Sequence, residues 1–330
     1  MNLTEFNQSD LCVHFSCPER GESPAVYVLL YTCSAAVVLL TVCGNLLVII
    51  SVFHFKQLHT PANALVLSLA VSDFFIGAFV MLPMFIWTIE SCWIFGRDLC
   101  LMFWLINGFL TISATYTIVL IAIDRYLVLS NPFLYISKIS RRNMCKVIYS
   151  NLLVCLAYII AFYYFNGIFT GYLICPGECS FALSQVWFVM DLIYTFIFPL
   201  SVIIIFYTLV FVIAKKHATA IRELNNHTRP KTQKITSHSM KSERKAAKVL
   251  GILVSVFLVS LLPYYIYSIL GDVVELQAET IHKVLILAYL NSTINPFIYA
   301  VFYPWFRKCI KLIITFQIFQ TDSALISVFS

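Results

Sequence analysis

Charged residues are scarce in this chain, at 12% of its 330 residues. An average soluble domain has about 25%. Hydrophobic residues make up 60% of the sequence, and the mean hydropathy of +0.87 lies far outside the soluble range. The sequence also has no histidine or cysteine set at metal-ligand spacing and no constellation of nucleophile and base, so an enzyme is disfavoured. The composition indicates a membrane protein.

Seven apolar runs are long enough to cross a hydrocarbon core of about 30 Å, which takes about 20 residues. They lie near residues 26–53, 63–89, 100–123, 144–168, 185–214, 247–270 and 281–303. We predict an all-α membrane protein, a seven-transmembrane helix bundle over 26–303, after an extracellular tail at 1–25. A polar, basic intracellular loop covers about 215–246, and 304–330 should form a short amphipathic eighth helix and a cytoplasmic tail. No apolar run follows a basic start in the first 25 residues, so we expect no cleavable signal peptide.

Basic residues predict the orientation of the bundle. Of 22 Lys and Arg residues, only Arg20, Arg97 and Lys283 fall on the side of the N-terminus, and the other 19 fall on the opposite side or at helix ends beside it. Cytoplasmic loops carry the excess of Lys and Arg, so we predict a multi-pass plasma-membrane protein with an extracellular N-terminus. Two sequons, at Asn2 and Asn7, then lie where glycosylation occurs. The net charge of +6 reflects this topology and does not support nucleic-acid binding.

The eleven cysteines divide in the same way. Disulfides form in the oxidising environment outside the cell. Six cysteines lie there or at the outer rim of the bundle: Cys12, Cys17, Cys92, Cys100, Cys175 and Cys179. The other five lie within the membrane or on its reducing side, and the sequence by itself does not choose the disulfide pairs.

Two acids lie well inside predicted spans, Asp73 in the second and Asp191 in the fifth. An ionisable group in the hydrocarbon costs roughly 2.5 to 3.5 kcal/mol on insertion scales, so each should face the bundle and have a partner or a function. Asp191 lies about six residues into its helix, or ~9 Å below the outer surface, where a ligand can reach it. Alternatively, it pairs with a hydroxyl group of a neighbouring helix or reaches outwards as a neutral acid.

Short motifs recur in nearly every predicted helix. They are Gly44-Asn45, SLAVSD ending at Asp73, Cys100, Asp124-Arg125-Tyr126, Pro199, Tyr207, Pro263 and NPFIY over 295–299. Together and in this order they resemble the rhodopsin-like, or class A, G-protein-coupled receptors. NSTINPFIYAVFYPWFRK at 291–308, with CPGECS before helix five, SERKAAKVLG at helix six and IFQTDS in the tail, is similar to the trace amine-associated receptors. Those receptors act largely in the olfactory detection of amines.

That family binds the ligand's ammonium group with an acid in helix three, 18 residues before the Arg of the Asp-Arg-Tyr motif, and Asn107 occupies this position here. Some fish members carry an acid in helix five, eight residues before Pro199, at the position of Asp191. The resemblance therefore implies a fish-type olfactory member in which Asp191 binds the ammonium group, while Asn107 adds a hydrogen bond without charge. The alternative is a class A receptor for a non-amine small molecule, with Asp191 structural.

The implied ligand-binding residues lie in the outer half of the bundle, on helix faces set by four-residue spacing. They are Trp104, Asn107, Gly108 and Thr111 in helix three, Phe188, Asp191, Leu192 and Thr195 in helix five, Tyr264 and Tyr265 in helix six, and Tyr289 in helix seven. Aromatic rings around a cation contribute about 0.5 to 2 kcal/mol each, although helical aromatics more often serve packing. One acid at this depth favours a monoamine, or an amine with a neutral polar far end, over a diamine.

The resemblance also implies an activation switch at the inner face. Its residues are Asp124, Arg125, Tyr126, Tyr207, Glu243, Phe257, Pro263, Asn295, Pro296 and Tyr299. A bridge from Arg125 to Glu243 would hold the inner cleft shut, although Glu243 could instead be a solvated loop charge. Leu261 stands where relatives have a Trp two residues before the helix-six proline, so the helix-six hinge must respond through other contacts. The implied partner is a stimulatory or olfactory heterotrimeric G protein that raises cAMP.

A polar cluster resembles the site that holds an allosteric sodium ion in the inactive state of such receptors. Its candidate residues are Asp73, Asn45, Ser113, Asn291, Ser292 and Asn295. Ala114 stands where a helix-three serine is typical, and Ser113 is adjacent. A water-filled polar network is the alternative. We expect no other cofactor.

Disulfides and the tail complete the resemblance. It implies a bridge from Cys100 to Cys179 and a second from Cys17 to Cys175, with Cys12 as the alternative to Cys17 and Cys92 as a free buried thiol. After helix seven, an amphipathic stretch is predicted to lie on the inner leaflet, with its apolar side in contact with lipid. Its residues are Phe302, Trp305, Phe306, Ile310 and Leu312, with Arg307, Lys308 and Lys311.

Two other membrane classes are disfavoured. A channel or transporter would need a polar stripe across the whole membrane, and a retinal-binding light receptor would need a lysine midway along helix seven, whereas Lys283 lies at its outer end. The predicted partners are thus a small-molecule amine, a heterotrimeric G protein and membrane lipid. The resemblance implies a location in the cilia of olfactory sensory neurons. The sequence names neither the amine nor the G-protein subtype.

Overall fold

The structure is a computed structural model of the chain. It describes residues 17, 21–170, 177–179, 184–227, 251–252, 255–267, 269–270, 278–320 and 323–328. The predicted glycosylation sites Asn2 and Asn7, as well as Cys175 and Glu243, lie outside the described residues.

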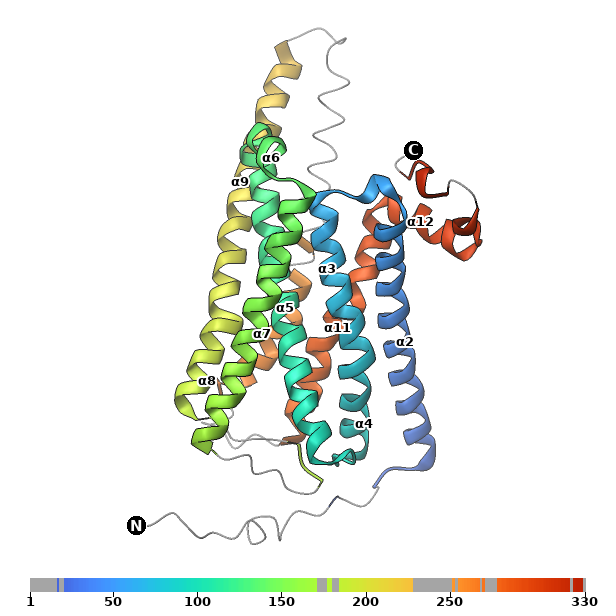
Figure 1. Cartoon of the computed structure of the whole chain (residues 1–330), viewed down its shortest axis with the longest axis vertical. Helices are drawn as coiled ribbons and strands as arrows, with labels where there is room; N and C mark the ends of the chain where they lie inside the picture. Colours follow the sequence, from blue (N-terminus) through green and yellow to red (C-terminus); the bar gives the residue numbers. More distant parts are fainter. Residues whose placement is uncertain are drawn as a thin grey trace.

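Helices account for nearly all of the described chain (Figure 1). They are α2 (Pro24–His54), α3 (Pro61–Phe75), α4 (Leu82–Glu90), α5 (Gly96–Ser130), α6 (Pro132–Lys138), α7 (Arg141–Thr170), α8 (Gln185–Leu192), α9 (Phe198–His227), α11 (Ala278–Phe302) and α12 (Pro304–Ile314), with the short segments η1 (Lys56–Leu58), η2 (Ile76–Met81), η3 (Ile193–Ile197), η4 (Gln317–Phe319) and η5 (Ser323–Leu325). In the described part, six helical stretches are long and apolar enough to cross a membrane, and Ser255–Tyr267 is a shorter apolar helix within the predicted sixth span. The predicted all-α bundle of seven spans is therefore confirmed.

Several helices extend beyond the predicted spans. The third span, α5, begins at Gly96 rather than near residue 100 and continues to Ser130 rather than 123. The fifth continues through α9 to His227, beyond the predicted end at 214. Hydropathy marks only the part of a helix that lies in hydrocarbon, whereas backbone hydrogen bonding carries a helix on into water.

Two spans contain a π-helical segment directly before a proline. In the second span η2 precedes Leu82 and Pro83, and in the fifth η3 precedes Phe198 and Pro199. Proline lacks an N–H group and crowds the carbonyl four residues earlier, and a wider π turn accommodates it. An extra residue in one turn rotates the flanking parts of a helix by about 100° relative to each other. Because η3 directly follows α8, this turn sets the direction in which Asp191 points.

The long helix α5 lies at the centre of the packing. It contacts α3, α7 and α9, while α2 packs against α3 and α11. Buried side chains form one large apolar cluster that includes Leu65, Ile118 and Tyr299, and a second that includes Met84 and Tyr289. Side chains from all seven spans thus meet in these two clusters.

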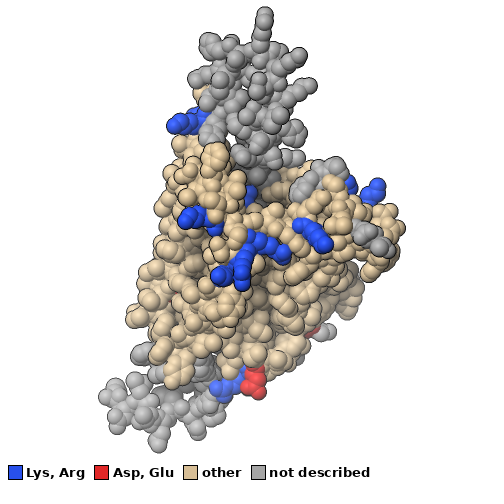
Figure 2. All heavy atoms as spheres, turned by 45° about the horizontal axis from the view of Figure 1, so that its top comes forward, with Lys and Arg blue, Asp and Glu red and all other residues tan. Residues whose placement is uncertain are grey.

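The two ends of the bundle differ in charge. We call the end that holds the Cys100–Cys179 disulfide the disulfide end, and the opposite end the basic end. Figure 2 turns the basic end forward and shows Lys and Arg gathered there, with acidic residues only at the far edge of the view. Among the described residues, the exposed basic residues of this end are Lys56, Lys138, Arg142, Lys146, Lys215, Lys216, Arg307 and Lys311. Among the described residues, Glu22, Asp98 and Glu178 are acids with exposed surface, and all three lie at the disulfide end.

The structure corrects the predicted position of α12. Trp305, Phe306 and Leu312 are buried in the large apolar cluster, so they pack on the protein rather than on the inner leaflet. The chain turns at Tyr303 directly after α11, which brings α12 against α2 and α11. The Arg307 guanidinium donates hydrogen bonds to the α11 carbonyls of Ala300 and Val301, at 3.0 and 2.9 Å, and fixes this turn.

Candidate ligand-binding site

Asp191 lies in the second turn of α8, near the disulfide end. The helix begins with Ser184 as its N-cap residue, whose hydroxyl group accepts a hydrogen bond from the backbone N–H of Trp187 at 3.4 Å. The π segment η3 follows directly, and Thr195 within it donates its hydroxyl hydrogen to the Asp191 carbonyl at 2.7 Å. These contacts fix the backbone on both sides of the acid, so its half-buried carboxylate has a defined direction.

The Asp191 carboxylate has one side-chain partner among the described residues. Tyr158 of α7 donates its hydroxyl hydrogen to Oδ1 at 3.0 Å. The Tyr158 ring stacks on Tyr194 of η3, with centroids 4.0 Å apart and planes at 26°. Tyr194 in turn accepts a hydrogen bond through its carbonyl from Tyr116 of α5 at 2.9 Å. The acid is therefore paired with a hydroxyl group of a neighbouring helix, as one of the two sequence-based alternatives stated.

A second chain of contacts joins the Asp191 region to helix six. Tyr265 donates its hydroxyl hydrogen to Thr195 Oγ1 at 3.1 Å. Its ring also stacks on Phe196, with centroids 4.0 Å apart and planes at 20°. The π segment is therefore in direct contact with Ser255–Tyr267.

A neutral polar group lies across the bundle. Asn107 of α5 is buried and accepts two hydrogen bonds through Oδ1, from Tyr289 of α11 at 3.0 Å and from Thr111 at 3.2 Å. This arrangement assigns Oδ1 as the acceptor and leaves the Asn107 amide hydrogens available to a ligand. Asn107 can therefore orient a polar group but supplies no counter-ion for a cation.

A cavity of about 420 Å³ joins these two polar regions. This volume lies within the range of about 300 to 1,000 Å³ for small-molecule sites. Asp191 is the one charged residue in its described lining. All eleven predicted ligand-binding residues line it: Trp104, Asn107, Gly108, Thr111, Phe188, Asp191, Leu192, Thr195, Tyr264, Tyr265 and Tyr289.

Helix α7 contributes a wall that the sequence did not predict. Ile159, Phe162 and Tyr163 line the cavity, and Tyr158 bonds to Asp191 from the same helix. An ideal Cβ built on Gly108 of α5 would lie 2.8 Å from Ile159 Cδ1, so the two helices approach closely here. The fourth span has no polar motif in the membrane, so only its packing against α5 reveals which face is turned inwards.

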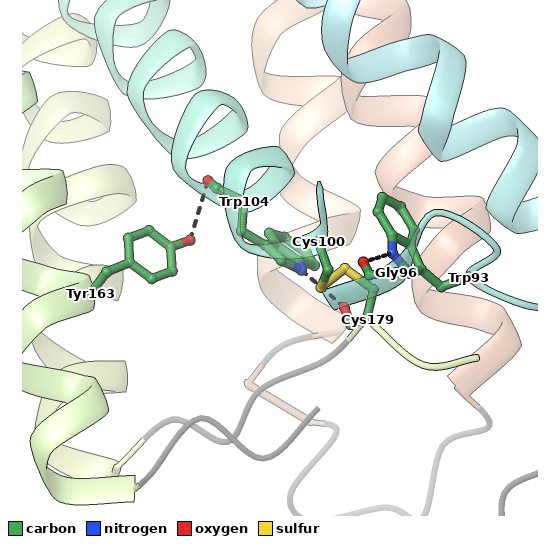
Figure 3. Close-up of a disulfide and its surroundings, with 6 residues drawn as sticks. All are labelled: Trp93, Gly96, Cys100, Trp104, Tyr163 and Cys179. Atoms are coloured by element: carbon green, nitrogen blue, oxygen red, sulfur yellow. Dashed lines mark hydrogen bonds between the residues drawn. A yellow bond between two sulfur atoms is a disulfide. The ribbon is translucent and has the colours of Figure 1, made fainter. Parts of the chain in front are cut away.

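The Cys100–Cys179 disulfide closes the site at the disulfide end (Figure 3). Trp104 donates its indole N–H to the Cys179 carbonyl at 2.9 Å. Tyr163 of α7 donates to the Trp104 carbonyl at 3.3 Å. The segment that carries Cys179 is thus fixed to both α5 and α7 beside the cavity, as the close-up shows. This disulfide is the one implied by the family resemblance.

The second disulfide differs from the prediction. The structure joins Cys17 to Cys92, with Cα atoms 5.3 Å apart, so the predictions of a Cys17–Cys175 pair and of a free Cys92 are wrong. Cys92 lies in the turn after α4, and its Trp93 neighbour pairs with Gly177 in a β-bridge. The Cys17–Cys92 disulfide attaches the N-terminal tail at Cys17 to the end of the second span. Sequence spacing held no signal for this choice because both candidates lie at the same rim.

The Asp73 carboxylate lies in a buried polar cluster in the middle of the bundle. It accepts hydrogen bonds from the Ser292 hydroxyl and the Asn295 amide of α11, each at 2.7 Å. Asn45 of α2 donates to the Ser292 carbonyl at 3.1 Å. Oδ1 of Asn45 and Oδ1 of Asn291 are buried and have no hydrogen-bond partner among the described residues. A carboxylate with nearby unsatisfied oxygens fits a hard cation such as sodium, and it fits ordered water.

Ser113 does not join this cluster in the described structure. It lies beside Cys155 of α7, and Ala114 takes the place in the apolar core next to α3. Consecutive residues on a helix point about 100° apart, so the neighbour of a core-facing position faces another helix. The structure therefore places Ser113 beside α7 and apart from the other candidate residues of the ion site.

At the basic end, the Asp124-Arg125-Tyr126 motif lies in the last turns of α5, which ends at Ser130. Arg125 forms an ion pair with Asp124, which also accepts a hydrogen bond from Tyr135 of α6 at 2.7 Å. Burial and the bond to this carboxylate raise the pKa of Tyr135, which therefore stays a hydrogen-bond donor. Tyr126 contacts Phe206 of α9 edge-on. Whether Arg125 reaches Glu243 lies outside the described residues.

The remaining predicted switch residues are spread from the cavity to the basic end. Phe257 is buried and lines the cavity together with Leu261. Pro263 lies on the next turn of the same helix, and Pro296 lies inside α11, where its ring touches Gly44 of α2. The Tyr299 hydroxyl group is buried without a partner among the described residues. Tyr207 is partly buried beside Gly251.

Comparisons with known proteins agree with this geometry. The family model for the 7 transmembrane receptor (rhodopsin family) matches residues 44–299. Trace amine-associated receptor 7a of Mus musculus is 36% identical over 339 residues, which cover 99% of this chain and 94% of the mouse protein. Trace amine-associated receptor 8 of Homo sapiens is 38% identical over 331 residues, covering 96% and 95%. The chain is a receptor rather than an enzyme, and it belongs to the trace amine-associated receptors within the rhodopsin family of seven-transmembrane receptors.

Proposed function

We propose that this receptor detects a small amine, whose ammonium group binds the Asp191 carboxylate. The observation that carries the proposal is that Asp191 is the one charged residue in the described lining of the cavity. Tyr158 bonds to Oδ1, so Oδ2 remains available to a cation. An ammonium beside a partly desolvated carboxylate forms a charge-assisted hydrogen bond, which strengthens as water is excluded. The relatives are trace amine-associated receptors, and their name supports the same ligand class.

The second polar group of the cavity favours a particular kind of amine. Asn107, held by Tyr289 and Thr111, lies opposite the acid and carries no charge. A ligand with its ammonium toward helix five and a neutral polar or apolar group toward Asn107 uses both regions. A diamine would leave its second ammonium without a counter-ion in the described lining. We therefore propose a monoamine.

One observation favours a second reading, a receptor for a non-amine ligand in which Asp191 is structural. The Tyr158 hydrogen bond already gives the acid a partner between α7 and α8. On this reading, a neutral analogue binds as well as the amine. The two readings therefore predict different potencies of the neutral analogue relative to the amine, and dose-response curves measure this ratio.

Signal transmission is proposed to run through the π segment. Thr195 connects the Asp191 carbonyl to Tyr265, and Phe196 stacks on the same ring. Leu261 occupies the cavity floor where relatives have Trp, so Tyr265 is the contact through which helix six senses the ligand. Outward motion of helix six about Pro263 would then open the basic end around Arg125.

The basic end is proposed to face the cytoplasm, because Lys and Arg accumulate on that side of membranes. The N-terminus and both described disulfides are then extracellular, in the oxidising compartment. At the basic end we propose a stimulatory or olfactory G protein, which raises cAMP, in the cilia of olfactory sensory neurons. Asp73 with Asn45, Asn291, Ser292 and Asn295 is proposed to hold an allosteric sodium ion, where the ion would stabilise the closed bundle.

The test is a set of matched ligand pairs in cells that express the full chain. Each pair contains an amine and the alcohol in which a hydroxyl group replaces the ammonium, for example 2-phenylethylamine with 2-phenylethanol, and diamines form a third group. cAMP and calcium are recorded in parallel. We expect monoamines to raise cAMP while their alcohols and the diamines are inactive over the same range. Alcohols as potent as the amines would contradict the ammonium site, and a calcium response without cAMP would contradict the G-protein assignment alone.

A further inference from the structure

The chain after α12 presents large apolar side chains away from the protein. Phe316 and Phe319 are 72% and 81% exposed, and their rings stack with centroids 6.3 Å apart. Ile314 at the end of α12 is 63% exposed. We call Ile314, Phe316 and Phe319 the wedge. Exposed aromatic residues so close together on a polar loop are uncommon, and they mark a contact surface.

The wedge has a fixed backbone. Phe316 adopts a left-handed conformation with φ of 57°, which is rare for a bulky residue. Its N–H donates to the Ile313 carbonyl at 3.0 Å, and its carbonyl accepts from the Phe319 N–H at 3.2 Å. A rare backbone conformation persists where the surrounding contacts determine it. The two phenyl rings are thus placed side by side by the fold.

The chain beyond the wedge is fixed to the first loop at the basic end. The His54 ring of α2 hydrogen-bonds to the Ser323 hydroxyl at 2.9 Å. The Val328 N–H donates to Gln57 Oε1 of η1 at 3.0 Å, and the Val328 side chain is buried. The wedge therefore lies between two attachments, α12 on one side and the Ser323–Val328 return on the other.

The surroundings of the wedge favour lipid as its occupant. Figure 1 shows α12 and the red segment after it projecting sideways from the bundle, beside the basic end of α2. On the neighbouring spans, Phe53 and Val301 are 60% and 65% exposed on helices that cross the membrane. The wedge thus adjoins the apolar belt of the bundle and lies to the side of the Arg125 region, where a G protein would bind.

Charge supports the same occupant. Residues 303–328 contain three basic residues, Arg307, Lys308 and Lys311, and one acid, Asp322. Basic groups beside an apolar insertion suit a leaflet with anionic headgroups, because the long Lys side chains reach the headgroups while the rings enter the hydrocarbon. A second copy of the chain would bring like charges together at this surface.

We propose that the wedge is an interfacial membrane anchor, in which Phe316 and Phe319 enter the hydrocarbon of the leaflet at the basic end and the exposed Lys311 contacts anionic phospholipid headgroups. The sequence predicted an anchor on the apolar side of α12, but that side is buried against the protein. The wedge takes the place of that anchor. Because the wedge is fixed to η1 and α12 together, lipid binding holds both elements at the membrane surface. The anchor is independent of the ligand that the cavity takes.

The test measures the depth of a spin label in the full chain in nanodiscs of phosphatidylcholine with phosphatidylserine. In a background with Cys12, Cys175 and the exposed described cysteines Cys33, Cys43 and Cys145 changed to Ser, a nitroxide is placed at Phe319→Cys or at the matched control Gln320→Cys. We expect the label at 319 to collide with oxygen more than with a water-soluble nickel chelate, and the label at 320 to show the reverse. The ratio of the two collision rates should differ about tenfold between the sites. Changing Lys311 to Gln should reduce the dependence on phosphatidylserine.

Equal nickel access at both sites would overturn the proposal. Dipolar broadening between labels at 319 on two copies would assign the wedge to self-association instead, and protection that appears only when a G protein is added would assign it to that partner. A second measurement needs no substitution in the chain. A phospholipid with a photoreactive diazirine in its acyl chain should cross-link residues 314–319 of the wild-type protein, and labelling there by a water-soluble diazirine instead would contradict the anchor.

Discussion

Replacing Asp191 by Asn is the most informative change to the site. It removes the negative charge and keeps nearly the same shape, and the amide oxygen can still accept the Tyr158 hydrogen bond. The fold should therefore tolerate Asp191→Asn. The change tests the charge alone, because the cavity retains its volume and its other lining residues.

The expected loss follows from the contact that the amine would make. A hydrogen bond to a charged group is worth about 1.5 to 3 kcal/mol, against about 0.5 to 1.5 kcal/mol for a neutral one. Unit charges 4 Å apart attract by about 4 kcal/mol at an effective dielectric constant near 20, and desolvation offsets part of this. A net loss of about 2 to 4 kcal/mol corresponds to a decrease in amine potency of about 30- to 1,000-fold.

The assay compares cAMP dose-response curves for wild type and Asp191→Asn at matched surface expression, with an amine and its alcohol analogue. We expect the amine curve to shift and the alcohol response to stay the same. Asp98→Asn is the matched control, because Asp98 is an exposed acid at the disulfide end outside the cavity, and it should shift the amine curve less than about threefold. An amine potency unchanged by Asp191→Asn would refute the reasoning, as would an equal shift from Asp98→Asn.

Three further experiments, two substitutions and one chemical modification, test other features of the structure. Tyr265→Phe loses the 3.1 Å hydrogen bond to Thr195 but keeps the aromatic ring, so amine binding should change little while the maximal cAMP response falls at least twofold; an undiminished maximum would remove Tyr265 from the proposed path. Gly108→Ala places a Cβ 2.8 Å from Ile159 Cδ1, so thermal unfolding in detergent should show a loss of about 1 to 3 kcal/mol, and wild-type stability would show that α7 is not in contact there. Burial raises the pKa of the Cys309 thiol to about 11, so about 0.1% of it is thiolate at pH 8. Mass spectrometry should therefore find Cys309 unmodified by iodoacetamide below about pH 10. Rapid modification at pH 8 would contradict the burial of this thiol.

The spans were predictable from local signals, and the family resemblance with helix spacing predicted 11 of the 25 described residues that line the cavity. Apolar length alone locates a membrane helix, and four-residue spacing places Asn107 and Thr111 on one face. An acid in hydrocarbon is costly, so Asp191 was expected to point into the bundle, and it lines the cavity.

The errors concern contacts between distant segments. Tyr158 was missed because its place beside Asp191 depends on the packing of α7 against α5 and on the π turn after α8. Cys92 was taken as free because nothing in its spacing showed that the tail returns to the second span. The apolar side of α12 was assigned to lipid because amphipathic periodicity does not distinguish a membrane from a protein core.

The most direct test of the central claim is the position of a bound amine. A structure of the full receptor with a potent monoamine, determined by electron cryo-microscopy, would locate the ammonium nitrogen relative to both polar regions of the cavity. The account predicts that this nitrogen lies about 2.7 to 2.9 Å from a carboxylate oxygen of Asp191, with the far end of the ligand toward Asn107. An ammonium group placed at Asn107 or outside the cavity, with Asp191 still bonded to Tyr158 alone, would contradict it.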